Sequence, residues 1–243
     1  MKFKDYKYER PNYEEIKKSF LELVDKIKNA STYDEQKLHI NQLNNIRKHI
    51  ETMSTLASIR NSINTADEFY DEEQNYWDEQ GPLYTELNSD FYKVIVNSKF
   101  KDEIKKDYSE QFYKICEYSL KSFSPEIISD LQEENKLSSQ YTKLLASAKI
   151  PFDGEERTLP GMGKYLLSED RNVREAASKA KYAFFEEHEA EIDEIYDQLV
   201  KVRTRIAKKL GFNNFVELGY VRMTRSDYNP EMVENFRKQV LDY

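Results

Sequence analysis

Glycine and proline are scarce in this chain, since each occurs six times in 243 residues. Both residues punctuate turns, so their scarcity disfavours a many-stranded sheet and predicts long helices. No apolar run approaches the length of a membrane-spanning helix, and the opening residues MKFKDYKYER lack the apolar core of a secretion signal. We therefore expect a mostly α, soluble protein without a membrane partner.

Cysteine occurs once, at Cys116, so no disulfide can form within the chain. Together with the missing secretion signal, this predicts a reducing, cytoplasmic location. Cys116 lies between Ile115 and Glu117 in a helical pattern, which favours a small core residue over a nucleophile.

Acidic residues outnumber basic ones by 45 to 37, which gives a formal net charge of −8. A negative chain repels nucleic acid and anionic lipid, so neither is expected as a partner. Acid pairs are frequent at this composition, and we interpret Glu72–Glu73 and Glu133–Glu134 as solvated helix faces. The 18 tyrosines and 13 phenylalanines are interpreted mainly as core residues.

Apolar residues recur every three or four positions through most of the chain, which predicts a series of helices. Side chains able to cap a first turn mark the expected helix starts at Asn12, Thr32, Thr65 and Ser124. The helix after Thr65 meets Gly81–Pro82, where the proline either kinks the helix or restarts it. Further helical patterns run from 83 to 96 and from 102 to 120.

One stretch departs from helical spacing. Residues 148–152 lead into Asp153–Gly154, a favoured two-residue hairpin turn, and residues 155–159 can return as the partner strand. Pro151 would then lie on a sheet edge, because it has no amide hydrogen to donate. A small β-hairpin near 148–159 is the only β structure that we expect.

The stretch from 170 to 228 carries the clearest apolar stripe. Its members are Ile192, Ile195, Leu199, Val202, Ile206 and Leu210. This spacing predicts a long, partly buried helix, and Gly211 follows where a helix needs a left-handed terminator. A last helix is expected from Pro230, behind the capping candidates Asp227 and Asn229.

The residues of this stretch also carry a resemblance. The runs DRNVREAASKA, LVKVRTRIAKKLGFNNFVELGY and VRMTRSDY resemble the oligoendopeptidase F group of the thimet-oligopeptidase-like zinc metallopeptidases. The opening KFKDYKYERP is similar to the start of that group, so the resemblance covers most of this chain but only the front of such an enzyme. It implies a helical lobe at 1–123, followed at 124–243 by a helix, the hairpin and long helices leading into an incomplete catalytic domain.

The resemblance implies zinc in the full-length enzyme, but none bound by this segment. A helical zinc peptidase uses His-Glu-x-x-His, whose two histidines share one helix face and bind the metal. His188–Glu189 begins such a motif, yet Ile192 occupies the second ligand position. His39 and His49 do not share a helix face. We therefore assign no catalytic and no metal-binding residue to this chain.

The segment GYVRMTRSDY holds the candidate substrate-binding residues Arg222, Arg225 and Tyr228. Arginine suits bidentate contacts with a carboxylate, including the terminus of a peptide. A salt-bridge cluster between helices explains the same residues without a ligand, and we favour it.

The expected function is that of the N-terminal portion of a zinc-dependent oligoendopeptidase, which hydrolyses short peptides and uses this lobe as a wall of its channel. The alternative is a stand-alone helical interaction module without catalysis. The last predicted helix stops at Tyr243 with its apolar face unanswered, which we interpret as truncation that would favour self-association. An exposed apolar strip at 230–243 favours the first hypothesis, and a closed surface favours the second.

Overall fold

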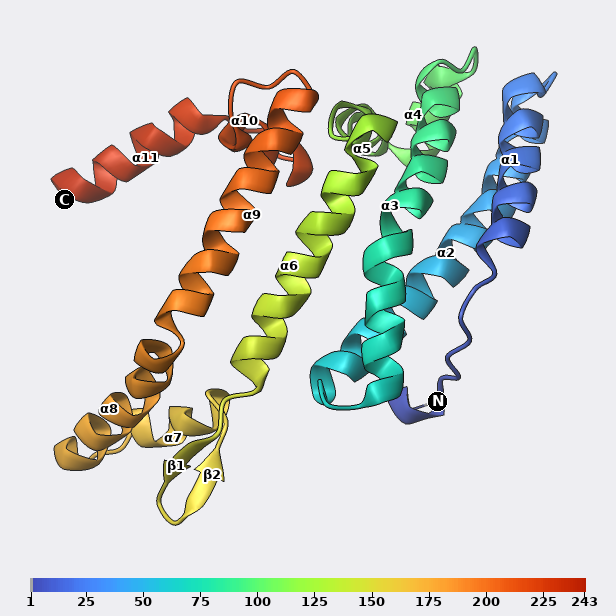
Figure 1. The fold of residues 1–243 in the computed structure, drawn as a ribbon. Coiled ribbons are helices and arrows are strands. Elements are labelled where there is room, and N and C mark those ends of the chain that lie inside the picture. Colours follow the sequence, from blue (N-terminus) through green and yellow to red (C-terminus); the bar gives the residue numbers. More distant parts are fainter. Residues whose placement is uncertain (1) are drawn as a thin grey trace.

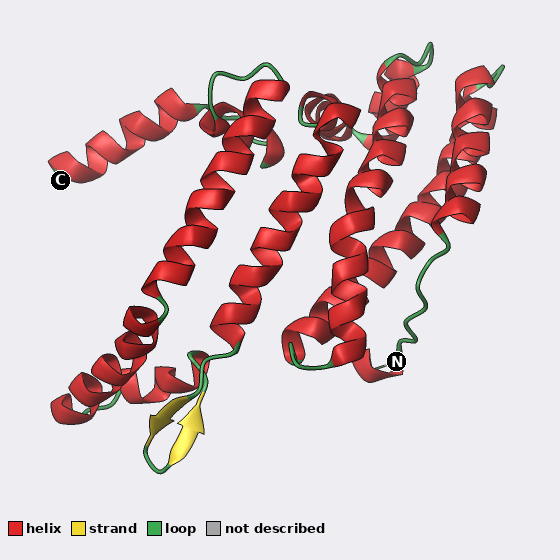
Figure 2. Ribbon diagram, viewed as in Figure 1, coloured by secondary structure: helices red, strands yellow, loops and turns green. Residues whose placement is uncertain are grey.

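The computed structural model describes residues 2–243. These residues form eleven α-helices and one two-stranded antiparallel sheet, with 78% of the residues helical (Figure 2). The predicted mostly α fold with one small hairpin is confirmed. Within this range, no helix combines the length and the apolar character needed to cross a bilayer.

In the first half of the chain, α1, α2 and α3 pack against one another (Figure 1). The helices there are α1 (Tyr13–Asn29), α2 (Tyr33–Ile63), α3 (Glu68–Val96), α4 (Lys101–Tyr108) and α5 (Glu110–Lys121). Asn12 accepts hydrogen bonds from the amides of Glu14 and Glu15, and Thr32 accepts one from Glu35. Two predicted helix starts are thereby confirmed.

Two boundaries in this half differ from the prediction. α3 begins after Asp67 rather than Thr65, because the Asp67 carboxylate accepts a hydrogen bond from the Tyr70 amide at 3.2 Å. The pattern from 102 to 120 is divided between α4 and α5 at Ser109, whose φ of 98° lies in the region that ends a helix. The Ser109 hydroxyl then caps α5 by accepting from the Phe112 amide.

The second half of the chain is built on α6 and α9, which lie along one another (Figure 1). Its elements are α6 (Ile128–Ala146), β1 (Ile150–Phe152), β2 (Glu155–Arg157), α7 (Gly163–Leu166), α8 (Arg171–Glu187), α9 (Glu189–Lys209), α10 (Phe215–Arg222) and α11 (Pro230–Asp242). Ser124 makes no cap bond, contrary to the prediction, and a 3₁₀ turn at Pro125–Ile127 precedes α6. At the hairpin, Asp153 and Gly154 have φ values of 53° and 74°, as a two-residue turn requires.

α3 runs through Gly81–Pro82 without ending. A proline has no amide hydrogen, so the carbonyl four residues earlier, that of Asp78, loses its helical donor. Asn135 of α6 donates to that carbonyl at 3.1 Å, and Gln132 donates to the carbonyl of Glu79 at 2.8 Å. The interruption in the hydrogen bonding of α3 therefore becomes a docking point for α6.

α8 ends at Glu187 and α9 begins at Glu189, so the two helices are separated at His188 and do not form one continuous helix. The predicted apolar stripe lies within α9 except for Leu210, which follows the last residue of the helix, and Val202 and Ile206 are fully buried. Gly211 has a φ of 83° directly after the helix, which confirms the predicted terminator. Asn229 caps α11 by accepting from the Met232 amide at 2.9 Å.

The buried apolar residues form three clusters. The first lies among the five helices α1 through α5 and contains Phe20, Phe91 and Cys116. The second lies between α6, α9 and α10, and the third lies beneath the hairpin and α8. Cys116 is fully buried, and burial raises the pKa of its thiol to about 12, so it is a core residue as predicted.

α11 extends away from the other helices (Figure 1). Most of its apolar side chains are exposed, among them Phe236 by 64%, Val240 by 63% and Leu241 by 85%. An exposed apolar strip at 230–243 is what the N-terminal-portion hypothesis predicts, whereas the interaction-module hypothesis predicts a closed surface.

Candidate functional site

Arg222, the first candidate substrate contact, lies at the end of α10 and is bound to Glu134 of α6. Its Nη1 is 3.0 and 2.9 Å from the two carboxylate oxygens. Arg203 of α9 donates to the same carboxylate from Nε at 2.8 Å. One acid on α6 thus holds two arginines from two other helices, which is the geometry of the salt-bridge cluster.

The same face of α6 carries a second ionic cluster, one turn earlier. Asp130 accepts from Arg205 Nε and from Lys209 Nζ, each at 2.6 Å. Burial alone would raise the pKa of Asp130, but the hydrogen bonds from Lys209 and Arg205 outweigh it and hold that pKa below its ordinary value. The basic residues near the end of α9 therefore serve to join α9 to α6.

Arg225 and Tyr228 lie in the segment between α10 and α11. The Arg225 guanidinium is 4.7 Å from the ring centroid of Tyr220 and 5.3 Å from that of Tyr228. Both distances suit cation–π contact. The structure thus places Arg225 and Tyr228 together, whereas Arg222 is engaged with Glu134, and a role of the three in binding substrate stays a prediction.

A buried acid that the sequence did not indicate lies in the first half of the chain. Glu73 is only 3% exposed and receives Arg10 Nη2 at 2.6 Å and Nε at 3.0 Å, together with the Tyr8 hydroxyl. Trp77 donates in turn to the Tyr8 oxygen at 3.1 Å. Burial would raise the pKa of Glu73, but the hydrogen bonds from Arg10 and Tyr8 lower it. This cluster fastens the N-terminal segment to α3.

The interpretation of the acid pairs as solvated faces was therefore half wrong. Glu73 and Glu134 are buried, whereas Glu72 and Glu133 are exposed. Successive helical residues point about 100° apart, so one of two adjacent acids can face the core while the other faces solvent. The basic partners lie more than 60 residues away in sequence, at Arg10 and Arg222, so no local pattern could reveal the burial.

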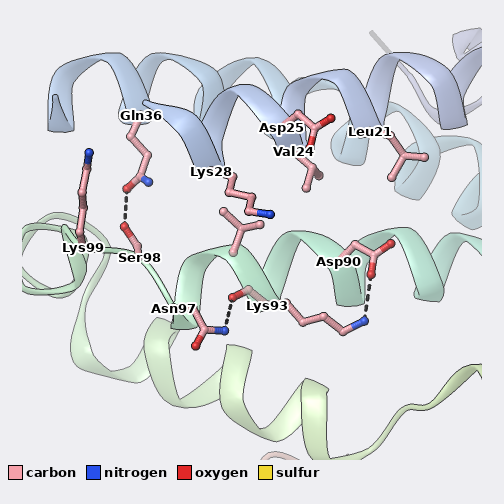
Figure 3. A pocket seen from close by; sticks show the side chains of 11 residues that line it. Leu21, Val24, Asp25, Lys28, Gln36, Asp90, Lys93, Asn97, Ser98 and Lys99 are labelled. Atoms are coloured by element: carbon pink, nitrogen blue, oxygen red, sulfur yellow. Dashed lines mark hydrogen bonds and ion pairs between the residues drawn. The ribbon is translucent and has the colours of Figure 1, made fainter. Parts of the chain in front are cut away.

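A cavity of about 680 Å³ lies between α1 and α3 near their C-terminal ends (Figure 3). Its buried polar residue is Gln36, whose amide donates to the Ile27 carbonyl and accepts from Ser98, both at 2.9 Å. Lys93 on the cavity wall pairs with Asp90 at 2.9 Å. Because these groups bond to one another, the cavity does not identify a ligand.

A metal site is not formed by the residues that the structure describes. Within 2–243, no group of three or more histidine, cysteine, aspartate or glutamate side chains is arranged to hold an ion. His188 packs on the Phe184 ring at 4.5 Å between centroids, and its Nδ1 is 3.6 Å from a Glu191 oxygen. These residues do not fit a catalytic zinc, so no zinc chemistry is assigned to them.

Comparison with known proteins gives consistent results. The Peptidase M3 N-terminal domain matches residues 3–123. A structure described as an oligoendopeptidase F from Bacillus anthracis str. Ames shares 52% identity and a TM-score of 0.97, over all of this chain and 45% of that one. PZ peptidase A, solved with an inhibitor, shares 50% identity and a TM-score of 0.95, over 98% of this chain and 42% of its own. No curated protein sequence matches the chain.

A third structure, also described as an oligoendopeptidase F, shares 46% identity and a TM-score of 0.96 over 99% of this chain and 42% of that one. The helical fold and these matches define the N-terminal part of an oligopeptidase. The chain belongs to the peptidase M3 family, in the oligoendopeptidase F group. It spans less than half the length of these relatives.

Proposed function

We propose that this chain is the N-terminal portion of a zinc-dependent oligoendopeptidase that hydrolyses short peptides. The observation that carries the proposal is the 52% identity over the full chain to a protein described as an oligoendopeptidase F. The backbone agreement is equally extensive, with a TM-score of 0.97. In this proposal, zinc and its ligands belong to a part of the protein outside these residues.

The role of this portion is to form one wall of the substrate channel. The ionic clusters on α6 support a structural role, because they hold α6, α9 and α10 in fixed relation. Arg225 and Tyr228 lie together at the connection to α11, where they offer a cation and an aromatic face. We include them, with Arg222, as candidate substrate contacts.

The test is hydrolysis of a fluorogenic short peptide by the full-length protein that contains this chain. Activity that is lost with a zinc chelator and restored by added zinc is expected, with no activity from the 243-residue chain alone. Zinc-dependent cleavage by the isolated chain would contradict the assignment of the active site to other residues. An inactive full-length protein would contradict the peptidase proposal itself.

The stand-alone interaction module is the less supported alternative. It predicts a closed surface, whereas Phe236, Val240 and Leu241 on α11 are exposed. The same strip supports self-association of the isolated 243-residue chain, which sedimentation equilibrium would detect. A cytoplasmic location also belongs to the proposal, and the single cysteine supports it.

A further inference from the structure

Four acidic side chains are buried among the residues that the structure describes: Glu73, Asp78, Asp130 and Glu134. Three of them, Glu73, Asp130 and Glu134, are paired with arginine or lysine side chains. Asp78 is only 5% exposed, yet within residues 2–243 it forms no ion pair, and neutral groups bind both of its carboxylate oxygens. A buried charge without a partner costs free energy, so Asp78 requires an explanation that the other three acids do not.

Asp78 lies at the contact between α3 and α6, which joins the first half of the chain to the second. The Ser139 hydroxyl donates to its Oδ2 at 2.6 Å, and the Asn135 side chain donates to its main-chain carbonyl at 3.1 Å. Both donors belong to α6. Gln74, one turn earlier on α3, donates to Oδ1 at 2.9 Å. A single residue of α3 is thus bonded to α6 through its side chain and its main chain, so its charge acts directly on this contact.

The charged groups around Asp78 leave its charge uncompensated. On α6, Lys136 pairs with Glu79 at 2.8 Å, and Lys143 pairs with Asp71. Among the described residues, α2 contributes no acidic or basic side chain to the cavity walls that Asp78 shares with it. Burial raises the pKa of Asp78 above its ordinary value of 3.8, and the hydrogen bonds and the two lysines offset only part of that rise.

Water reaches Asp78 through the cavity where α2, α3 and α6 meet. Asp78 lines this cavity, which has a volume of about 240 Å³, and it also lines a neighbouring cavity of about 380 Å³. Either volume exceeds the roughly 30 Å³ that a water molecule occupies in the liquid. Hydroxyl and amide side chains, among them Ser58 and Asn135, form much of both walls. The carboxyl group is therefore able to exchange a proton with solvent.

The neutral acid also fits these surroundings. A hydroxyl both donates and accepts, so the Ser139 oxygen can accept a hydrogen bond from protonated Asp78. The side-chain amide of Gln74 carries an oxygen as well as a donor, so it can bond to the other carboxyl oxygen in either state. Protonation therefore removes the cost of a buried charge and keeps both side-chain partners.

We propose that Asp78 is a proton-sensitive switch in the contact between α3 and α6. Uptake of a proton from water removes the buried charge and tightens the contact, whereas release of the proton restores the charge and loosens it. Because this contact joins the two halves of the chain, mild acidification holds the halves together more firmly. The switch belongs to the fold of these residues and does not depend on the proposed peptidase function.

The first experiment compares urea unfolding of the 243-residue chain and of Asp78→Asn from about pH 4 to about pH 8. Asparagine has the shape of the protonated acid and carries no charge. The stability that Asp78 contributes is fully present below its ordinary pKa of 3.8 and is lost as the pH rises through its higher folded pKa. Asp78→Asn should therefore raise the urea midpoint at about pH 8, and this gain should shrink towards about pH 4. Asp90→Asn makes the same change on α3 at a side chain that is 37% exposed and paired with Lys93, so it should not raise the midpoint.

The second experiment follows the side-chain carboxyl of Asp78 by carbon-13 NMR during a pH titration, with its signal identified by its absence from Asp78→Asn. A midpoint above 3.8 is expected. Ser139→Ala should raise the midpoint further, because the hydroxyl favours the ionised form. Thr142→Ala should leave it unchanged, because Thr142 lines the same cavity but donates to the Ser138 carbonyl. A midpoint at or below 3.8 would overturn the proposal. So would an equal loss of stability in Asp78→Asn at every pH, since Asp78 would then serve only as a hydrogen-bond acceptor.

Discussion

Replacing Glu134 should show most clearly how much the ion pairs between helices contribute to the stability of this protein. The carboxylate holds Arg222 at 2.9 Å and Arg203 at 2.8 Å, and its side chain is only 11% exposed. Replacing it in Glu134→Gln leaves two guanidinium groups, one of them only 23% exposed, without a negative partner. Breaking a fully buried pair costs about 3–5 kcal/mol, whereas an exposed pair contributes about 0–1 kcal/mol.

The intermediate burial of this cluster gives an expected loss of about 2–3 kcal/mol in the free energy of unfolding. For a chain of this size, each kcal/mol lowers the melting temperature by about 2–4 °C, so a decrease of roughly 4–12 °C is expected. Urea unfolding and thermal melts followed by circular dichroism measure both quantities. Glu133→Gln is the matched control, because Glu133 is 49% exposed and, within residues 2–243, pairs with Arg205 alone. It should cost less than about 1 kcal/mol.

A double-mutant cycle tests whether Glu134 stabilises the protein through its contact with Arg222. Arg222→Met should also destabilise, and the double variant Glu134→Gln/Arg222→Met should lose less than the sum of the single losses, by about 0.5–3 kcal/mol. Strict additivity, or equal losses for Glu134→Gln and Glu133→Gln, would refute the conclusion that Glu134 holds these helices together.

Three further predictions concern other elements. The pKa of Glu73 is lowered in the folded protein, so the stability that Glu73 contributes is present above the ordinary pKa of 4.5 and is lost as the pH falls through the folded pKa. Glu73→Gln should therefore flatten the dependence of stability on pH below 4.5 by at most about 1.4 kcal/mol per pH unit. An unchanged acid slope in urea unfolding would contradict this prediction. Gly211→Ala should cost about 1–2 kcal/mol in thermal melts, because φ is 83° with open space around the added methyl. Gly163→Ala, at a helical φ of −54°, should not destabilise, and equal effects of the two changes would rule out the conformational explanation. Asn135→Leu should lower the free energy of unfolding by about 1–3 kcal/mol, because it removes the donor to the Asp78 carbonyl. Adding Pro82→Ala should recover part of this loss by restoring an amide hydrogen in α3. No recovery would mean that Asn135 stabilises the protein through another contact.

Features governed by neighbouring residues could be predicted from the sequence. Asn12, Thr32 and Asn229 cap helices within three residues of themselves, and Gly211 ends α9 through its own φ. The Asp153–Gly154 turn sets the hairpin in the same local manner. The resemblance of the stretch from 170 to 228 led to the peptidase M3 family, which the comparisons then showed. In each case the determining interaction, or the recognisable run of residues, is contiguous in the chain.

Tertiary structure alone decided which polar groups are buried and what they contact. Glu73 and Glu134 looked like their exposed neighbours, because the arginines that neutralise them arrive from distant segments. Helical pattern could not decide what Pro82 does within α3, since the side-chain amide of Asn135 on α6 occupies the Asp78 carbonyl that the proline leaves without a donor. The cavity where α2, α3 and α6 meet arises in the same way, because its lining residues Ser58, Asn61 and Ser139 come from helices that are distant in sequence. Burial depends on the packing of whole helices against one another, and no single segment of the sequence determines that packing.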